Sequence, residues 1–172
     1  MTGAARASVE VPAAPHEAFV CFADVAAWWP AELTWSQDAL ESLEIEPRVG
    51  GLCRERGPGG FTCDWGRVLE WEEGRRLAIA WSIGAGREPV PDPERASRVS
   101  VTFSPAAGGT RVDVAHDRFE RHGPGAEGYR EAMEQGWRNA ARALLGPREP
   151  SPNRGGRVAR PVALTVRPWR PA

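Results

Sequence analysis

The chain has 172 residues, enough for one domain with a substantial hydrophobic core, and its 41% hydrophobic and 26% charged residues are ordinary for a globular protein. All 22 basic residues are arginine. Residues 147–172 contain six arginines and one glutamate, a net charge of +5. Since the whole chain has a net charge of −1, residues 1–146 have a net charge of −6. The acidic body argues against a nucleic-acid partner, and the lack of any apolar run near the ~20 residues of a membrane span argues against a membrane partner.

The cysteines and histidines predict neither a disulfide framework nor a metal site. Three cysteines, an odd number, together with an N-terminus that lacks the apolar stretch of a secretory signal, indicate free thiols in a cytoplasmic protein. The cysteine spacing is too wide for a metal knuckle, and the histidines complete no ligand set. We find no serine nucleophile elbow, cysteine–histidine pair or phosphate loop, so nothing indicates covalent catalysis; no cofactor is expected either. The residues concerned are Cys21, Cys53, Cys63, His16, His116 and His122.

The first elements are a strand and two short helices. Residues 6–11 alternate as a strand that ends at Pro12. Residues 15–29 then carry apolar side chains at steps of three and four, which is the period of an amphipathic helix. Asp24 interrupts this run at a position suited to an N-cap, so we expect a break there and an end at Pro30.

From residue 40 to residue 118 the period changes to two, which predicts six strands separated by short Gly- and Pro-rich turns. Strands joined in this way form an antiparallel meander. The parity of the segment between Cys53 and Leu69 is ambiguous. In this segment or directly after it lie the charged residues Arg54, Asp64, Arg67 and Glu70. We expect their side chains to face solvent. The alternative is that one or two of them point into the interior.

A long helix is predicted from Ala126 to Leu145, with Tyr129, Met133 and Trp137 on one face. Gly136 in its middle predicts a close approach to the sheet, because glycine costs helix stability. Residues 147–172 are rich in Pro, Gly and Arg and are expected to be disordered, although residues 162–166 have the composition of a strand.

These segments resemble the SRPBCC (START/Bet v 1-like) superfamily and, within it, the AHSA1-like family, named for the activator of Hsp90 ATPase. The likeness is carried by VPAAPHEAFVCFADVAAWWP (11–30), PRVGG (47–51), GRVLEWEEGRRLAIAWSI (66–83), VSVTFSPAAGGTRVDVAHDRF (99–119) and GWRNAARALL (136–145). The resemblance implies an α+β helix-grip domain over residues 1–146. In that fold a curved antiparallel sheet wraps around the C-terminal helix and commonly leaves a cavity for a hydrophobic small molecule.

Large aromatic side chains on the inward-facing positions are the candidate ligand-binding residues. The chain has eight tryptophans, and Trp28 and Trp29 lie where the family's short helices close the mouth of the cavity. The alternative is that the same side chains form a solid core. The full candidate set is Trp28, Trp29, Trp81, Phe103, His116, Tyr129, Met133 and Trp137.

His116 is the one candidate for a catalytic role. It has the same strand parity as Val112 and Val114 and should therefore point inward. An imidazole there suits a general acid or base, or an anchor for a ligand carbonyl. The alternative is a histidine at the strand end that bonds to a loop carbonyl or to water.

The sequence leaves three functions open. The first is binding of a hydrophobic or aromatic small molecule between the sheet and the long helix, without catalysis. The second is a cyclase- or hydrolase-like enzyme that uses the same cavity. The third is a protein-interaction module associated with chaperones and the stress response, as the family name implies. The acidic body and basic tail also favour self-association as a homodimer.

Overall fold

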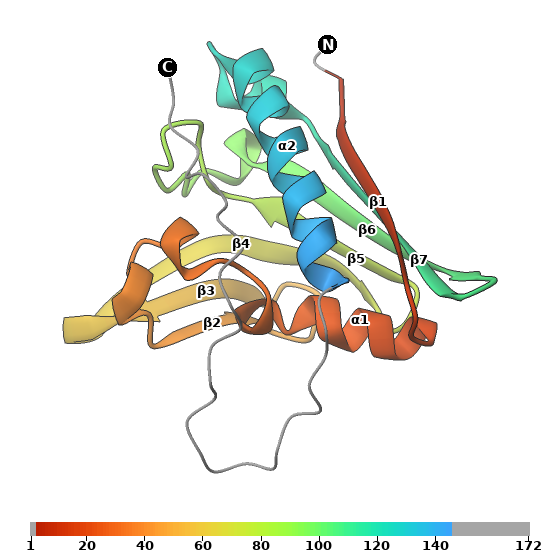
Figure 1. Ribbon diagram of the computed structural model, residues 1–172. Helices are drawn as coiled ribbons and strands as arrows, with labels where there is room; N and C mark the ends of the chain where they lie inside the picture. Colours follow the sequence, from red (N-terminus) through yellow and green to blue (C-terminus); the bar gives the residue numbers. More distant parts are fainter. Residues whose placement is uncertain (1–2, 146–172) are drawn as a thin grey trace.

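Residues 3–145 are described by the computed structural model of the chain (Figure 1). The strands are β1 (Ala5–Val11), β2 (Ser42–Ile45), β3 (Leu52–Gly57), β4 (Phe61–Glu72), β5 (Arg76–Trp81), β6 (Ser97–Ala106) and β7 (Gly109–Asp117). The helices are α1 (Pro15–Ala23) and α2 (Ala126–Leu144). Short 3-10 turns are η1 (Val25–Ala27), η2 (Ala31–Leu33), η3 (Gln37–Ala39), η4 (Pro58–Gly60), η5 (Pro93–Arg95) and η6 (Phe119–His122).

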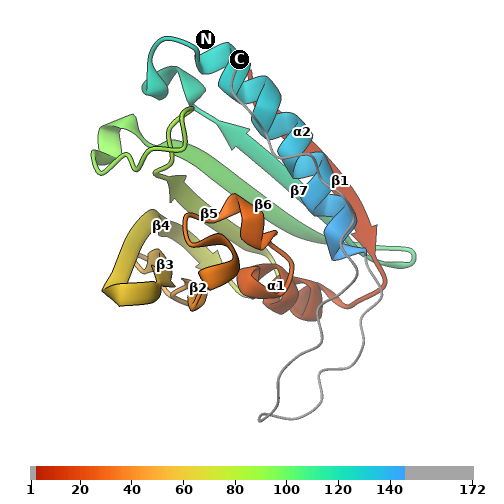
Figure 2. The ribbon, with the colours of Figure 1, turned by 60° about the vertical axis from the view of Figure 1, so that its left-hand side comes forward.

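Within the described residues the strands form one seven-stranded antiparallel sheet in the order β1-β7-β6-β5-β4-β3-β2. The sheet curls, and α2 lies across its concave side over β1 and β7 (Figures 1 and 2). The segment after α1 lies over the β2–β5 side of the same face (Figure 2). This arrangement confirms the predicted helix-grip α+β fold.

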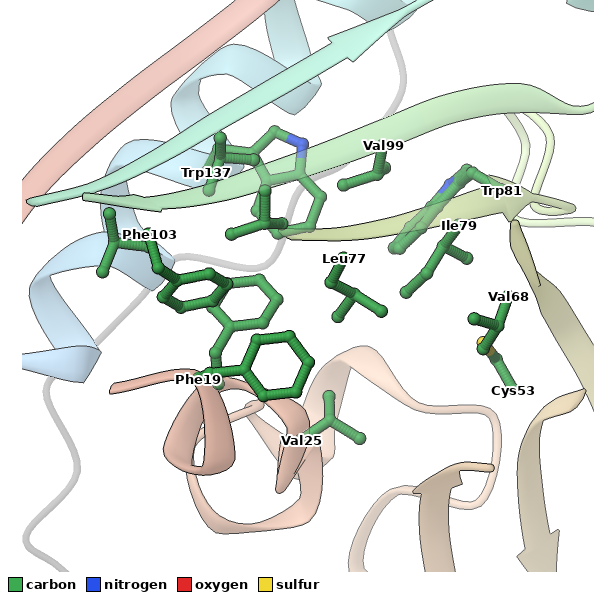
Figure 3. Close-up of a cluster of buried hydrophobic side chains, with 14 of the residues drawn as sticks. Phe19, Val25, Cys53, Val68, Leu77, Ile79, Trp81, Val99, Phe103 and Trp137 are labelled. Atoms are coloured by element: carbon green, nitrogen blue, oxygen red, sulfur yellow. The ribbon is translucent and has the colours of Figure 1, made fainter. Parts of the chain in front are cut away.

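Helix α1 forms where the apolar period predicts it and fills one end of the concave face. Pro15 occupies its first turn, and the Glu17 carboxylate accepts a hydrogen bond of 3.1 Å from the Ala14 N–H. Its buried Phe19 meets Phe103 of β6 edge-on, with ring centroids 5.2 Å apart (Figure 3). The break at Asp24 is confirmed, but the Asp24 side chain makes no capping hydrogen bond, and the second short helix is only the turn η1.

Rows of buried side chains cross the central strands. Leu77 on β5 pairs with Val101 on β6, which in turn pairs with Val114 on β7. The next row is Ile79, Val99 and His116. His116 therefore faces inward, as its parity predicts, and it is fully buried. These rows form the floor of the concave face.

A β-bulge resolves the parity that the sequence leaves ambiguous. In the register of β3 with β4, Cys53 pairs with Gly66 and Arg54 pairs with Asp64, so Trp65 is the extra residue. The bulge places Trp65 and Cys63 on the inner face, where both are buried. Arg54 and Asp64 form an ion pair of 2.6 Å on the outer face, and Arg67 and Glu70 also lie on that face, as expected.

Helix α2 buries Tyr129 and Trp137 and half-buries Met133, which is the predicted stripe, and it also buries Ala141. The prediction for Gly136 was wrong: this residue is exposed, and a β-carbon built there would meet no atom within 4 Å. Gly136 precedes the buried Trp137 and lies on the solvent side of the helix. Its helical position therefore has no packing requirement for glycine.

The remaining sequence predictions fall partly outside the described residues. The expected disorder of residues 147–172, and the strand considered for residues 162–166, both lie there and stay predictions. Cys21, Cys53 and Cys63 are free thiols, as predicted. No helix among residues 3–145 combines the length and hydropathy needed to cross a bilayer.

Candidate functional site

A small cavity of about 50 Å³ lies on the concave side of the sheet. Its wall combines β2–β6, Phe22 of α1, Trp137 of α2 and residues 24–40, which we call the cover segment. Six of the chain's eight tryptophans line it, all within the described residues: Trp28, Trp29, Trp35, Trp65, Trp81 and Trp137. The other lining residues are Phe22, Val25, Leu33, Thr34, Leu43, Ile45, Glu55, Ile79, Ile83 and Val99. The unusual tryptophan content of the chain is thus concentrated in one place.

The structure divides the eight predicted ligand-binding residues into two groups. Trp28, Trp29, Trp81 and Trp137 line the cavity, whereas Phe103, His116, Tyr129 and Met133 do not. Phe103 is covered by α1, where it contacts Phe19 and Phe22. Tyr129 and His116 lie behind the cavity wall. The cavity is therefore enclosed mainly by the sheet and the cover segment, and α2 contributes only Trp137 to it.

Tyr129 holds Trp81 in the wall. The Trp81 indole N–H donates to the Tyr129 hydroxyl at 2.9 Å, and that hydroxyl donates to the Ile83 carbonyl at 2.7 Å. Burial raises the pKa of Tyr129, so the phenol stays neutral. Trp81 also meets the Trp137 ring with centroids 5.8 Å apart, an edge-on contact that fixes both rings.

His116 holds Trp137 in the same way. The Trp137 indole N–H donates to His116 Nδ1 at 3.2 Å, so this nitrogen is the acceptor and Nε2 carries the ring proton. Nε2 lies 2.7 Å from the Ser97 hydroxyl, which lies 2.9 Å from His122 Nε2. Both His116 nitrogens thus have protein partners. Burial, and secondarily the nearby His122, hold the pKa of His116 well below its ordinary value.

The buried, neutral His116 predicts a loss of stability in acid. Because its pKa is lowered by folding, the unfolded chain binds the proton first as the pH falls below about 6.5. Stability should be complete above that pH and fall below it, by at most about 1.4 kcal/mol per pH unit for this histidine. Urea unfolding between about pH 8 and pH 5 should show a weaker pH dependence in His116→Gln.

The exposed His16 offers a matched control for this measurement. His16→Gln should retain the full acid dependence of the unmodified protein. Equal pH dependence in His116→Gln and in the unmodified protein would contradict a neutral, buried His116.

Glu55 is the site residue that the sequence prediction missed. Among the described residues it is the only buried carboxylate, with 1% of its surface exposed, and it lines the cavity. Its Oε1 accepts a hydrogen bond from the Ser36 N–H at 2.7 Å, and its Oε2 accepts one from the Trp35 N–H at 3.1 Å. Its inward parity with the buried Cys53, two residues earlier, was the available signal.

Arg87 connects the cover segment to the loop after β5. Its guanidinium donates to the Leu33 carbonyl at 2.6 Å and to the Thr34 carbonyl at 3.3 Å. In return, the Trp35 indole N–H donates to the Arg87 carbonyl at 3.1 Å. Arg87 adopts a left-handed backbone conformation (φ +65°), which costs energy for a side chain of this kind. Glu55 and Arg87 therefore hold the cover segment from two sides.

The apolar and aromatic lining of the cavity can bind an apolar molecule, and the Glu55 carboxyl group in that lining can take part in one proton transfer. Burial, and secondarily the nearby Glu55, raises the pKa of the Cys63 thiol to about 11. That thiol is therefore not a nucleophile near neutral pH. Among residues 3–145 no cluster of three or more His, Cys, Asp or Glu side chains is placed to hold a metal ion.

Comparison with known proteins identifies similar chains. The model of the family "Activator of Hsp90 ATPase homolog 1-like protein" matches residues 16–145. The anthrahydroquino-γ-pyrone synthase Txn09, solved in complex with a compound designated SUM, is 38% identical, with a TM-score of 0.54 over 77% of this chain and 87% of that one. No curated protein matches this chain.

Two further structures share the fold at lower identity. Protein MLL2253 from Mesorhizobium loti is 17% identical, with a TM-score of 0.59 over 82% of this chain and 93% of that one. The Aha1 dimer from Colwellia psychrerythraea is 13% identical, with a TM-score of 0.58 over 82% of this chain and 92% of that one. At these identities the likeness extends to the fold alone.

Proposed function

This chain belongs to the activator of Hsp90 ATPase homolog 1-like family, and we propose that it binds a planar aromatic small molecule in the tryptophan-lined cavity. The observation that carries the proposal is the gathering of six indole rings around one cavity. Rings of this size offer a ligand about 25 cal/mol per Å² of buried apolar surface, and edge-on or offset ring contacts add to it. The cost of association reduces the net gain.

The size of the cavity implies that the cover segment moves when a ligand enters. About 50 Å³ suffices for water, whereas pockets for drug-sized ligands measure roughly 300–1,000 Å³. The cover segment consists of short 3-10 turns, which have few internal hydrogen bonds. Its connections to Glu55 and Arg87 are the polar contacts that opening would break.

A cyclase-like activity is the second candidate, favoured by the 38% identity to a pyrone synthase. In a cyclisation of that kind, an aryl β-diketone with an ortho hydroxyl closes to a γ-pyrone. The hydroxyl oxygen bonds to the distal carbonyl carbon, and one water leaves. Glu55 is placed to accept the hydroxyl proton, since it lines the cavity. His116 lies behind Trp137 and is a positioning residue in this scheme. A hydrolase-like reaction, a chaperone-associated role and a homodimer stay predictions.

The binding proposal is tested by native mass spectrometry of the purified protein and by titration with hydroxyanthraquinone followed by tryptophan fluorescence. We expect saturable quenching, and weaker affinity in Trp29→Phe, which removes one indole from the wall. Trp71→Phe is the matched control, because Trp71 packs against Phe19 and does not line the cavity. It should leave the affinity unchanged.

A protein that carries no small molecule and shows no quenching with hydroxyanthraquinone would contradict the binding proposal. The cyclase candidate has its own readout, the formation of a γ-pyrone from an ortho-hydroxyaryl β-diketone. Glu55→Gln should abolish that reaction. Persistence of full turnover in Glu55→Gln would remove Glu55 as the proton acceptor.

A further inference from the structure

The indole N–H groups around the cavity are not equivalent. Four of the six lining tryptophans donate to protein acceptors: Trp28 to the Phe22 carbonyl, Trp35 to the Arg87 carbonyl, Trp81 to the Tyr129 hydroxyl and Trp137 to His116. The N–H of Trp65 is buried and has no hydrogen-bond partner among the described residues. Trp65 is 6% exposed and lines the cavity. Burial without an acceptor is rare for an indole N–H and calls for an explanation.

The backbone around Trp65 is built to place this ring in the wall. Trp65 is the extra residue of the bulge in β4, and its own carbonyl accepts a hydrogen bond of 3.0 Å from the Ser82 N–H. The next residue, Gly66, has no room for a side chain, since a β-carbon there would lie 2.8 Å from the Ala80 carbonyl oxygen. Bulges that redirect a side chain are frequent beside functional sites. The unpartnered donor is thus held in a paired and tightly packed backbone.

The neighbouring strand carries a buried acceptor that lines the same cavity. Glu55 of β3 pairs with Cys63 of β4, two residues before Trp65, and both Glu55 and Trp65 line the cavity. Each Glu55 oxygen already accepts one backbone N–H of the cover segment. A carboxylate oxygen can accept a second hydrogen bond, so both oxygens retain capacity for a ligand. Two residues of the mostly apolar lining, on adjacent strands, therefore carry an unpartnered donor and a buried acceptor, Trp65 and Glu55.

We propose that the Trp65 N–H and the Glu55 carboxylate form a two-point polar anchor that selects hydroxylated aromatic ketones or quinones. The ligand carbonyl oxygen accepts from Trp65, and a ligand hydroxyl donates to Glu55. This inference rests on the proposed function, because it specifies the class of aromatic molecule that the cavity takes. A hydrocarbon of the same shape would fill the cavity and leave the Trp65 N–H without an acceptor.

Three probes of matched shape separate the two contacts: hydroxyanthraquinone, methylanthraquinone and methylanthracene, each substituted at the same ring carbon. Their dissociation constants are measured by fluorescence titration with the unmodified protein and with Trp65→Phe. Loss of one hydrogen bond to a buried donor corresponds to about a tenfold change in affinity. We therefore expect the preference for methylanthraquinone over methylanthracene to fall about tenfold in Trp65→Phe. The additional preference for the hydroxyl compound should remain.

Trp29→Phe is the matched control, because it makes the same change in the same wall at a residue outside the anchor. It should weaken all three probes alike and leave their ratios unchanged. Equal ratios in Trp65→Phe and in the unmodified protein, with binding intact, would overturn the anchor and leave the proposed function standing. Failure of every probe to bind would overturn both.

A measurement on the unmodified protein tests the same contact and does not depend on whether Trp65→Phe folds. One indole N–H signal in the proton–nitrogen correlation spectrum should move downfield when methylanthraquinone binds, because it gains an acceptor. The downfield movement of the same signal should be clearly smaller when methylanthracene binds, because that probe supplies no acceptor and acts only through its ring current. Equal movement of the indole signals with both probes would contradict a hydrogen bond from Trp65 to the ligand carbonyl.

Discussion

Replacement of Trp137 by alanine is expected to lower the free energy of unfolding by about 4 kcal/mol, the usual cost of removing a buried tryptophan. Trp137 is 4% exposed, and its ring meets those of Trp29 and Trp81 at centroid distances of 6.1 and 5.8 Å. Its loss also leaves His116 Nδ1 without a donor. Equilibrium unfolding in urea at neutral pH measures the change.

Trp137→Phe is the control that separates the contribution of an aromatic ring at this position from that of the indole N–H. It keeps an aromatic ring between α2 and the sheet and removes only the N–H and part of the ring volume. We expect it to cost less than half as much as alanine. If both variants unfold at the same urea concentration as the unmodified protein, α2 is not packed on the sheet through Trp137. In both variants the affinity for hydroxyanthraquinone should fall, since Trp137 is the one contribution of α2 to the cavity.

Glu55→Ala is expected to cost about 3 kcal/mol and to release the cover segment. The change removes the acceptor of two hydrogen bonds, from the N–H groups of Trp35 and Ser36, and bonds of this kind to a charged group are each worth roughly 1.5–3 kcal/mol. Relaxation of the segment into water should recover part of this loss. Urea unfolding gives the free energy, and amide hydrogen exchange of residues 24–40 reports the release of the segment.

The exposed Glu44 on β2 offers a matched substitution. Its ion pair with Arg56, at 3.4 Å, has about half of each side chain in solvent. Glu44→Ala should therefore change stability by less than about 0.5 kcal/mol and leave exchange in residues 24–40 unaltered. Unchanged exchange in Glu55→Ala would contradict the assignment of Glu55 as the residue that holds the cover segment.

The same contacts connect the stability of the cover segment with ligand entry. Glu55 belongs to the wall of the cavity and also binds the segment that closes it. Opening of the segment for ligand entry breaks its two hydrogen bonds to Glu55, and when they form again over the bound ligand each oxygen can still accept a ligand hydroxyl. In the proposed complex, Glu55 therefore supports closure of the segment and recognition of the ligand at once.

Local patterns were sufficient for the elements and their order. The period of two predicted the strands from residue 40 to residue 118, and the period near 3.6 predicted α1 and α2, because each pattern records which side of an element meets the core. The strand parity of His116 also predicted its inward side chain correctly. The five segments shared with the family then indicated the helix-grip fold, which the structure confirms.

The position of the cavity depended on contacts between residues distant in the chain. The bulge at Trp65 shifts the register of β3 against β4, and periodicity alone does not locate an extra residue in a strand. It therefore left the inward position of Trp65 unpredicted, whereas Glu55 lies on the regular strand β3 and shares its parity with the buried Cys53. Likewise, Phe103 and Tyr129 face inward as ligand-binding residues would, but α1 covers Phe103, and Tyr129 packs behind Trp81.

Where the alternation or the helical spacing is regular, the sequence alone determines which side chains face the interior, because both patterns are local properties of the chain. Whether an interior side chain borders empty space or another side chain is a property of packing between elements. The path of residues 24–40 across β2–β5, held by Glu55 and Arg87, places the cavity beside six tryptophans and leaves His116 behind its wall. That path is fixed by hydrogen bonds between residues 19 to 54 positions apart, which no local pattern records.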